Sequence, residues 1–462
     1  MSANQPHRIV IVGGGAGGLE LATKIGDALG KRKQAEITLV DKSPTHVWKP
    51  LLHQIAAGTS GMLEHELEYL AQAHWHHFRF LLGEMVGLNR AGKVIQLSPI
   101  LDDRGLEISA ARSLQYDTLV FCVGSLANDF GTPGAKEHAI ALETHYDAAK
   151  FHRRLINAFI RAHSRSPLIS HKLDIAIIGA GATGVELAAE LHYTTRQLAA
   201  YGLDQVMPDR DVRLTLIEAA PRVLPALPER LSEAAMKQLE KLNVQVLTGD
   251  PVVKVSVDAV DTKGGKRVPA DLVVWAAGIK APDFLASIDG LETTRNNQVI
   301  VKQTLQTTRD DNIFAFGDCA ACPWPEKSGN VPPRAQAAHQ QATLMAANLK
   351  RRINGQALKD YRYRDFGSLV SLGEYSTVGN LMGSLSGGSI LIDGLFARLM
   401  YVSLYKLHLL ALHGFGKTVL DTIGRLKFRL DLAVRFSSMT DGDRPKGRRE
   451  RPLDPFQTPQ LW

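Results

Sequence analysis

The sequence predicts an α/β fold made of two dinucleotide-binding domains and a smaller amphipathic region near the C-terminus. The main observation is a glycine-rich turn between an apolar strand and a helix, which occurs twice in the chain. The length of 462 residues agrees with this, because one hydrophobic core seldom serves more than about 300 residues. A hydrophobic content of 45% with 40 glycines is typical of a globular α/β protein.

The first glycine-rich turn follows an apolar strand at residues 8–12. Gly13, Gly15 and Gly18 have the G-x-G-x-x-G spacing. The first glycine permits the sharp turn, the second lets backbone approach a pyrophosphate, and the third packs the helix on the strand. Asp41 ends the next apolar strand, where a ribose-binding carboxylate belongs. The strand, helix and acid together favour a nucleotide site over a glycine turn that binds nothing.

The second turn repeats this pattern. Gly179, Gly181 and Gly184 follow the apolar strand that begins at Leu173, and the next apolar strand ends in Glu218. Two such fingerprints predict two Rossmann-like domains and two dinucleotides.

Each half of the chain also contains a strand that ends in small residues and a glycine. These endings are Gly124 in "DTLVFCVG" and Gly278 in "DLVVWAAG", and they are expected where the chain passes closely between two nucleotide-binding lobes. A further short strand in "NIFAFGD" leads to Asp318, which is predicted to reach solvent beside a glycine.

These elements together resemble the two-dinucleotide flavoprotein family. The resemblance implies that the first fingerprint holds FAD, that the second holds NAD(P)H, and that Asp318 bonds the ribityl or phosphate region of the flavin. It also implies an interrupted layout, with an FAD-binding domain of residues 1–125 and 282–365. The NADH-binding domain of residues 165–281 would be inserted into it through the polar segment 161–167.

Two branches of this family do not fit the sequence. Disulphide reductases carry a redox cysteine pair after the first fingerprint, but residues 45–58 of this chain contain no cysteine. Sulphide-oxidising relatives need cysteines that Cys122, Cys319 and Cys322 superficially supply. Those relatives lose the second fingerprint, however, and it is intact in this chain.

The resemblance narrows to the bacterial type II NADH dehydrogenases. The segments that carry it are "HVWKPLLHQIAAG", "GATGVELAAEL", "VWAAGIKAPDFL", "FAFGDCAACPWP" and "VPPRAQAAHQ". It implies hydride transfer from NADH to tightly, non-covalently bound FAD, and then two-electron reduction of a membrane quinone without proton pumping. Two alternatives stay open: a soluble NADH-dependent flavin reductase with another acceptor, and a flavin-binding redox sensor without turnover.

A helix is predicted to begin near Arg334 in "RAQAAHQQ" and to aim its free amides at the flavin, where they stabilise negative charge. Gln336 and Gln340 lie one turn apart, so both amides can donate to a quinone carbonyl beside the flavin. The alternative is that they bond neighbouring backbone. His339 is expected to be a packing residue rather than a proton donor to quinone.

Two more site residues follow from the resemblance. Glu186, on the first turn of the second fingerprint helix, would lie near the nicotinamide of NADH. Lys49 would line the flavin. The alternatives are a carboxylate that only complements the helix dipole and a solvated lysine before a turn proline.

Neither of two metal-like groupings is predicted to bind a metal. Cys319 and Cys322 have ligand spacing but lack a second pair of ligands. His74, His76 and His77 are interpreted as a polar helix end. Three cysteines are too few for a disulphide framework in a chain of this size, so reduced thiols are expected.

The C-terminal region, residues 366–436, is predicted to associate with a membrane, and residues 437–462 are predicted to be a polar, flexible tail. Residues 395–417 place cations opposite aliphatic side chains, as in a helix lying in the membrane plane. Residues 425–436 alternate with period two and predict a strand. The alternative is a covered element at a domain or dimer contact.

The charge distribution and the N-terminus predict the location and the partners. Residues 391–462 hold twelve Lys or Arg and seven Asp or Glu, which accounts for five of the seven excess positive charges. An anionic lipid surface is therefore expected to bind residues 395–436. The N-terminal residues lack a signal-peptide pattern. The sequence also has no stretch of eighteen uncharged apolar residues, so it predicts no membrane-spanning helix. The expected location is the cytoplasmic side of the inner membrane. Membrane quinone is the expected partner, and no nucleic acid is expected to bind. The sequence leaves open whether the protein forms a homodimer.

Overall fold

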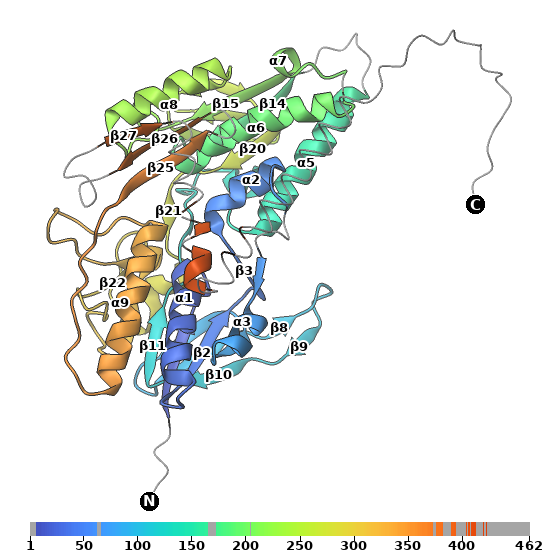
Figure 1. Cartoon of the computed structure of the whole chain (residues 1–462). Helices are drawn as coiled ribbons and strands as arrows, with labels where there is room; N and C mark the ends of the chain where they lie inside the picture. Colours follow the sequence, from blue (N-terminus) through green and yellow to red (C-terminus); the bar gives the residue numbers. More distant parts are fainter. Residues whose placement is uncertain are drawn as a thin grey trace, which may run out of the picture. The chain divides into compact units, whose positions relative to one another are not determined.

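The computed structural model describes residues 6–61, 66–164, 172–203, 205–372, 376–381 and 390–393, and beyond these positions 403, 405, 406, 408–412, 419 and 422. The chain divides into two units, residues 1–405 and residues 406–462. Every described strand belongs to the first unit (Figure 1).

The first glycine turn lies on a five-stranded parallel sheet with the order β23-β11-β1-β2-β5. Its strands are β1 (His7–Val12), β2 (Ala35–Asp41), β5 (Arg79–Leu82), β11 (Thr118–Phe121) and β23 (Ile313–Ala315). The central strand β1 is fully buried from Ile9 to Val12, which its continuous apolar run predicts for a parallel sheet covered on both faces. The sheet joins strands from both parts of the chain that were expected to hold FAD.

A second five-stranded parallel sheet, with the order β13-β20-β14-β15-β16, carries the second turn. Its strands are β13 (Ala139–Ala141), β14 (Leu173–Ile178), β15 (Val212–Ile217), β16 (Gln245–Leu247) and β20 (Leu272–Trp275). Since β13 precedes residue 165, this sheet includes chain ahead of the expected insertion point. The division into two domains remains a prediction.

The two segments that pass between the sheets pair with each other. β12 (Leu126–Ala127) runs antiparallel to β21 (Ile279–Lys280). Each follows one of the predicted glycines, and these have φ angles of +69° at Gly124 and +63° at Gly278. A positive φ is costly for other residues, so both glycines are required at these crossings.

Helices cover the sheets and join them. α1 (Ala16–Ile25) packs beside α9 (Ala335–Ile353), and α2 (Leu52–Ala57) packs between α5 (His145–His163) and α6 (Ala182–Ala200) (Figure 1). One hydrophobic core includes residues of α2, α5, α6, β14 and β15, so it extends from the first half of the chain into the second sheet. α5 continues to His163, and the first part of the predicted linker 161–167 is therefore helical.

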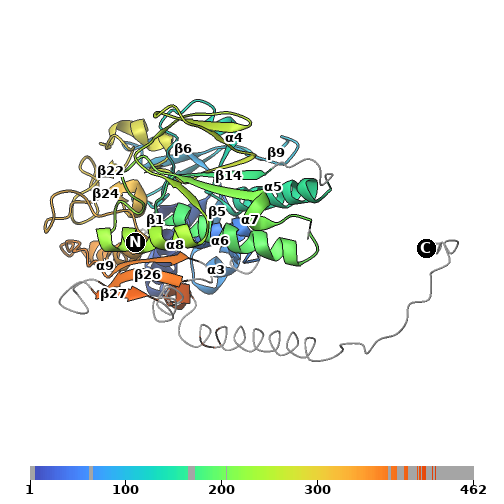
Figure 2. The same ribbon diagram turned by 90° about the horizontal axis from the view of Figure 1, so that it is seen from above.

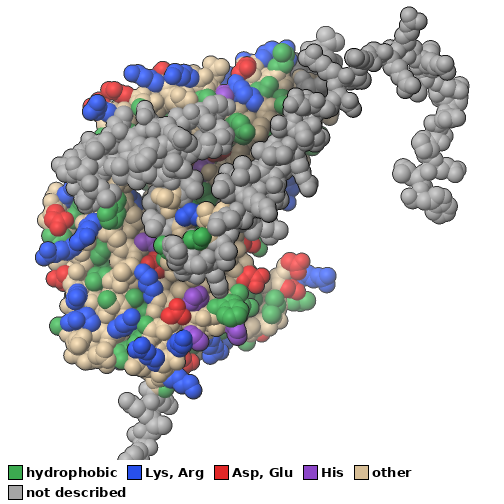
Figure 3. Space-filling view, viewed as in Figure 1, with side chains coloured by type: hydrophobic (Ala, Val, Ile, Leu, Met, Phe, Trp, Pro, Cys, Tyr) green, Lys and Arg blue, Asp and Glu red, His purple; other side chains and the backbone are tan. Residues whose placement is uncertain are grey.

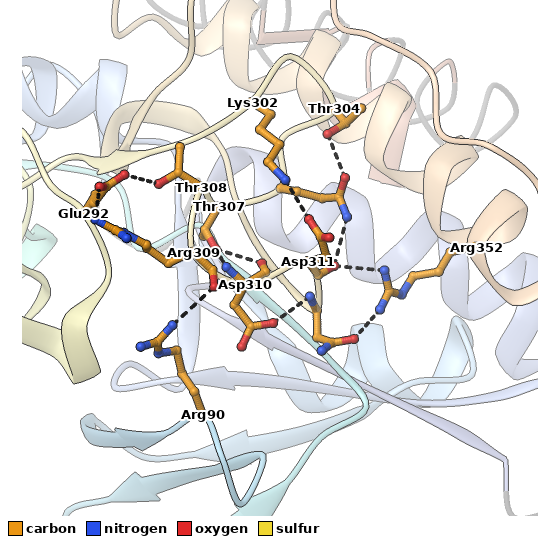
Figure 4. Close-up of polar contacts among 12 residues, drawn as sticks. Arg90, Glu292, Lys302, Thr304, Thr307, Thr308, Arg309, Asp310, Asp311 and Arg352 are labelled. Carbon is orange, nitrogen blue, oxygen red and sulfur yellow. Dashed lines mark hydrogen bonds and ion pairs between the residues drawn. The ribbon is translucent and has the colours of Figure 1, made fainter.

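The C-terminal end of α9 is fixed by a polar network around the turn at residues 302–312 (Figure 4). Arg352 donates from Nη1 to the Asp311 carbonyl at 2.9 Å and from Nη2 to the Asn312 side chain at 2.5 Å. Lys302 Nζ lies 2.7 Å from Asp311 Oδ1. This anchorage fixes the far end of the helix whose N-terminus carries the predicted glutamines.

A three-stranded antiparallel sheet of β25 (Gly367–Leu372), β26 (Ser376–Leu381) and β27 (Ile390–Asp393) lies beside α6 and α8 (Glu229–Lys241) (Figure 2). The described positions between 403 and 412 are helical, in agreement with the predicted helix 395–417. The rest of that stretch, most of its apolar side and the predicted strand 425–436 lie outside the described residues. Among the helices that are described, none is long and apolar enough to cross a membrane.

The remaining elements are short. Smaller sheets consist of β3 (Thr45–Val47) with β4 (Glu66–Glu68), β6 (Met85–Asn89) with β7 (Val94–Leu97) and β10 (Arg112–Gln115), β8 (Ile100–Leu101) with β9 (Glu107–Ser109), β17 (Val252–Val255) with β18 (Ala259–Thr262) and β19 (Arg267–Pro269), and β22 (Val299–Ile300) with β24 (Ala320–Ala321). The remaining α-helices are α3 (Tyr69–Trp75), α4 (Ala135–His138) and α7 (Pro208–Asp211).

Candidate active site

The first glycine turn is open where a pyrophosphate would lie. Gly13 has a φ of +102°, and a Cβ added at Gly18 would lie 1.9 Å from Gly13 O. At Gly15 an added Cβ would meet nothing within 4 Å. Among the described residues no side chain caps the N-terminus of α1, which begins after Gly15. A helix N-terminus with available amides beside an open glycine fits the phosphates of FAD.

The second turn has almost the same geometry. Gly179 has a φ of +101°, and a Cβ added at Gly184 would lie 1.9 Å from Gly179 O. Gly181 again has nothing within 4 Å of an added Cβ, and no described side chain caps α6. The chain therefore carries two glycine turns of equivalent geometry, as the repeated spacing predicts.

The two predicted ribose-binding acids are held in the same way. Asp41 accepts from the Gly14 N–H at 2.5 Å and from the Ser43 N–H at 2.8 Å, one bond to each oxygen. Glu218 accepts from the Ala180 N–H at 2.7 Å and from the Ala220 N–H at 2.8 Å. Burial raises the pKa of Asp41, and the two amides oppose this shift. Each carboxylate oxygen keeps a lone pair with which it can accept a ribose hydroxyl.

Two further side chains hold the first turn from outside, and the sequence patterns did not reveal them. His46 Nδ1 lies 3.0 Å from Gly14 O, and the Tyr69 hydroxyl donates to the same oxygen at 2.8 Å. Burial lowers the pKa of His46 to about 4, so the ring is neutral at pH 7 and its Nδ1–H is the donor. Tyr69 stacks on Phe80 with 4.9 Å between the ring centroids. Only proximity in the fold connects these residues with the turn.

Lys49, Asp318 and the segment after Gly124 converge beside the first turn. Lys49 Nζ donates to Ser125 O at 3.1 Å, and the Ser125 hydroxyl donates to Asp318 Oδ2 at 2.8 Å. Burial raises the pKa of Asp318, while Ser125 and Lys49 oppose the shift. Burial lowers the pKa of Lys49, while Glu143 and Asp318 raise it. The structure thus brings together three predicted flavin-side residues, with Ser125 as the link.

Gln336 and Gln340 lie on one face of α9, as predicted, and both contact the backbone of residues 364–367. Gln336 donates from Nε2 to Gly367 O at 2.9 Å and accepts from the Phe366 N–H at 3.1 Å. Gln340 donates from Nε2 to Arg364 O at 2.8 Å and accepts from the Arg364 N–H at 3.0 Å. Both glutamines therefore hold the chain that leads into β25.

Glu186 is buried between α6, α2 and β25. Its Oε1 accepts from the Ser371 N–H at 3.0 Å, and its Oε2 lies 3.6 Å from His53 Nδ1. Burial lowers the pKa of His53 to about 4, so at pH 7 the two groups do not form an ion pair. The predicted place of Glu186 near the nicotinamide stays a prediction.

His339 packs as expected and also contacts a buried acid. Its ring centroid lies 5.7 Å from that of Trp48, and its Nδ1 is bonded to Glu20 Oε2. Glu20 lies on α1 and also accepts from Lys24 Nζ at 2.6 Å. Together these contacts tie α9 to α1.

The three cysteines are free and buried. Burial raises the pKa of Cys122, and it raises the pKa values of Cys319 and Cys322 to about 12. They are therefore protonated and unreactive at neutral pH. The described residues contain no group of three or more His, Cys, Asp or Glu side chains that could hold a metal ion.

Comparisons with known proteins agree with this geometry. Residues 7–342 match the family described as pyridine nucleotide-disulphide oxidoreductase. The type II NADH:quinone oxidoreductase of Haemophilus influenzae is 41% identical over 443 residues, which are 92% of this chain and 99% of that protein. The Staphylococcus aureus protein of the same name is 29% identical over 390 residues, 84% of this chain and 92% of that protein.

Solved structures share the fold at lower identity. The Plasmodium falciparum NDH2 in complex with NADH superposes with a TM-score of 0.74 at 19% identity, covering 90% of this chain and 98% of that chain. The sulfide:quinone oxidoreductase of Aquifex aeolicus gives 0.70 at 19% identity, covering 88% and 92%. The duplicated turns, the matching family model and the 41% identical relative lead to one assignment. This chain belongs to the pyridine nucleotide-disulphide oxidoreductase family and, within it, to the type II NADH:quinone oxidoreductases.

Proposed function

We propose that this chain oxidises NADH and reduces a membrane quinone, with FAD as the bound cofactor. One observation carries the proposal: two glycine turns of equal geometry, each with a carboxylate held by two amides, lie in one compact unit. A single turn fits a protein that binds one nucleotide, whereas two fit an enzyme that brings a flavin and a nicotinamide together. Bound FAD supplies a two-electron acceptor for the hydride of NADH and a two-electron donor for quinone.

The residues proposed to hold FAD lie on the first sheet and on the segments beside it: Gly13, Gly15, Gly18, Asp41, Lys49, Gly124, Asp318 and Gln336. The backbone at Gly15 binds the pyrophosphate, and Asp41 accepts the ribose hydroxyls. Lys49 and Asp318, linked through Ser125, bond the ribityl and flavin end.

The residues proposed to hold NADH surround the second turn: Gly179, Gly181, Gly184, Glu186, Glu218 and Gly278. Glu218 accepts the ribose hydroxyls of NADH and repels a 2′-phosphate, which selects NADH over NADPH. The burial of Glu186 in a site that Ser371 and His53 also line supports a role in fixing the nicotinamide.

The quinone side is proposed to lie at the start of α9. The N-terminus of this helix has no capping side chain among the described residues, so it offers a positive dipole end where negative charge develops during reduction. Each glutamine amide nitrogen has two N–H groups, and the described contacts of Gln340 use one of them. The second N–H of Gln340 remains for a quinone carbonyl, whereas Gln336 Nε2 contacts both Gly367 O and Asp365 Oδ1. Both side chains hold residues 364–367 as a wall of the proposed quinone site.

The C-terminal region is proposed to keep the enzyme peripheral on the cytoplasmic side of the membrane. On the face seen in Figure 3, described Lys and Arg side chains are interspersed with Asp and Glu and form no single basic patch. The excess of Lys and Arg in the sequence of residues 391–462 supports the proposal that this region attracts anionic lipid.

A steady-state assay of the purified holoenzyme tests this function. NADH and a water-soluble quinone analogue should give turnover, and anaerobic NADH should bleach the flavin absorbance. Bleaching without quinone turnover would favour a reductase with another acceptor, and slow or absent bleaching would favour a redox sensor.

A further inference from the structure

An exposed phenylalanine, Phe130, follows β12, and nothing assigned above uses it. The side chain of Phe130 is 68% exposed, and its φ is +52°. A left-handed backbone is disfavoured for a bulky residue and occurs mainly where surrounding structure imposes it, often at binding sites. An exposed ring gains little from burial, so the stability of the fold does not explain this conformation.

The neighbouring side chains impose the conformation. Asn128 Oδ1 accepts from the Phe130 N–H at 3.0 Å, and Asp129 Oδ1 accepts from the Gly131 N–H at 3.0 Å. Trp275 Nε1 donates to Asn128 O at 2.9 Å, which ties this turn to the end of β20. The turn therefore presents the ring at a defined place.

That place is the carboxyl edge of the second sheet. A Cβ added at Gly278 would lie 2.4 Å from Cζ of Phe130, so the ring rests on the glycine backbone. The preceding residue, Ala277, has its Cα 2.7 Å from where a Cβ of Gly179 would lie. The ring of Phe130 thus contacts Gly278, and the residue before it, Ala277, lies against Gly179 of the second fingerprint.

The strand order indicates which half of NADH would lie there. β15 and β20 flank β14 on opposite sides. Glu218, after β15, takes the adenosine ribose, and the turn after β14 takes the pyrophosphate. The nicotinamide half therefore extends toward β20 and Gly278, where Phe130 stands.

We propose that Phe130 contacts NADH directly and covers its nicotinamide half. The inference rests on the proposed placement of NADH at the second fingerprint. The ring supplies an apolar face that shields the nicotinamide from water and limits the positions it can take. The positive φ of Phe130 costs stability, and it is retained because it places the ring where it binds NADH.

Rapid-mixing bleaching of the flavin by NADH tests this with Phe130→Ala and Phe130→Gly. The NADH concentration at half-maximal bleaching should rise about fivefold in both variants, because aromatic contacts contribute about that factor. The KM for the quinone analogue should not change. Phe130→Gly should also keep or raise the thermal midpoint, since glycine adopts a positive φ without strain. Tyr201→Ala removes an aromatic residue that is 79% exposed at the end of α6 and serves as the control.

Two outcomes overturn the inference. An unchanged half-saturating NADH concentration would show that the ring does not touch NADH. Weaker NADH binding together with a lowered thermal midpoint of Phe130→Gly would show that Phe130 supports the fold. Failure of the proposed function is seen separately, because the wild-type flavin would then not bleach with NADH at all.

Discussion

At the scale of single residues, both nucleotide turns depend on a carboxylate held by two backbone amides. Glu218 has this arrangement at the second turn. Arg222, a nearby cation that would soften repulsion of a 2′-phosphate, donates instead to the carbonyls of Leu224, Pro225 and Leu227. Arg222 is therefore not directed at Glu218, and we expect the charge of Glu218 to act at the proposed ribose site without opposition from this cation.

Glu218→Gln should weaken the preference for NADH over NADPH. The substitution removes the negative charge that repels a 2′-phosphate. It also replaces one of the two oxygens that accept backbone N–H groups with an amide nitrogen, a loss that affects both nucleotides alike. The ratio of kcat/KM for NADH to that for NADPH should fall about tenfold, which corresponds to about 1.4 kcal/mol. Glu229→Gln, on the exposed start of α8, is the matched control. A wild-type enzyme that already used NADPH as efficiently as NADH would remove this role from Glu218.

The sequence predicts these turn residues well because their constraints are local. Gly13 and Gly179 need positive φ angles, and Gly18 and Gly184 lie against the first glycine of their own turn. His46, whose partner is Gly14, could not be predicted in this way. Its partner is 32 residues away, and no spacing rule relates the two.

At the scale of elements, α9 is held at both ends. Arg352 fixes the C-terminal end of this helix. Near the N-terminal end of the helix, the glutamine pair binds the segment that precedes β25. The i, i+4 spacing of Gln336 and Gln340 predicted that they share a face. It did not predict their partners, because residues 364–367 reach this face only through the turn after α9. The backbone-bonded alternative raised from the sequence describes the contacts present in the structure.

Gln336→Ala and Gln340→Ala should slow the oxidation of reduced flavin by quinone about tenfold or more, and they should leave flavin reduction by NADH nearly unchanged. Each substitution removes amide hydrogen bonds, which contribute about 1 kcal/mol each, and loosens the proposed wall of the quinone site. Stopped-flow measurement of the two half-reactions separates the effects. Gln356→Ala, an exposed glutamine just beyond α9, is the control. Equal slowing of both half-reactions would mean that the pair serves the flavin or the fold.

At the scale of the whole molecule, buried neutral histidines contribute to the loss of stability in acid. Burial lowers the pKa values of His46 and His53 to about 4, below the usual value near 6.5. Between pH 6.5 and pH 4 the unfolded chain therefore binds protons that the native chain does not. The free energy of unfolding must fall as pH drops through this window, and the contribution is fully present above pH 6.5.

We expect the wild-type protein to lose about 2 kcal/mol of stability per histidine between pH 7 and pH 4.5. His53→Gln should flatten this dependence, because glutamine does not acquire a charge in this range. Urea unfolding at a series of pH values, followed by circular dichroism, measures the effect. His74→Gln, at an exposed position on α3, is the matched control. An equal slope in His53→Gln and wild type would contradict the buried, neutral state of His53.

Membrane association is proposed for the C-terminal region, and the structure refines where to test it. β27 pairs with β26 up to Asp393, so a truncation must fall after that residue to keep the sheet. The described His408, Leu409 and Leu412 are buried, so truncation before them would also remove covered apolar side chains. Neutralising cations in the full chain is therefore the cleaner experiment. The four cations of residues 425–436 are Arg425, Lys427, Arg429 and Arg435.

Changing these four cations to Gln should release the protein from anionic vesicles. Each cation near an anionic surface contributes about 1 kcal/mol, so about 4 kcal/mol, or several hundredfold in partitioning, should be lost. The loss should shrink as salt rises, because the attraction decays over about 10 Å at 0.1 M salt. Lys237→Gln with Lys241→Gln, on the exposed side of α8, removes two positive charges elsewhere and controls for half of the change in charge. Sedimentation with vesicles across a salt series, scored beside flavin content, gives the answer. A neutralised protein that binds as wild type does would place the membrane contact outside residues 425–436, and one that loses its flavin would show that this segment supports the fold.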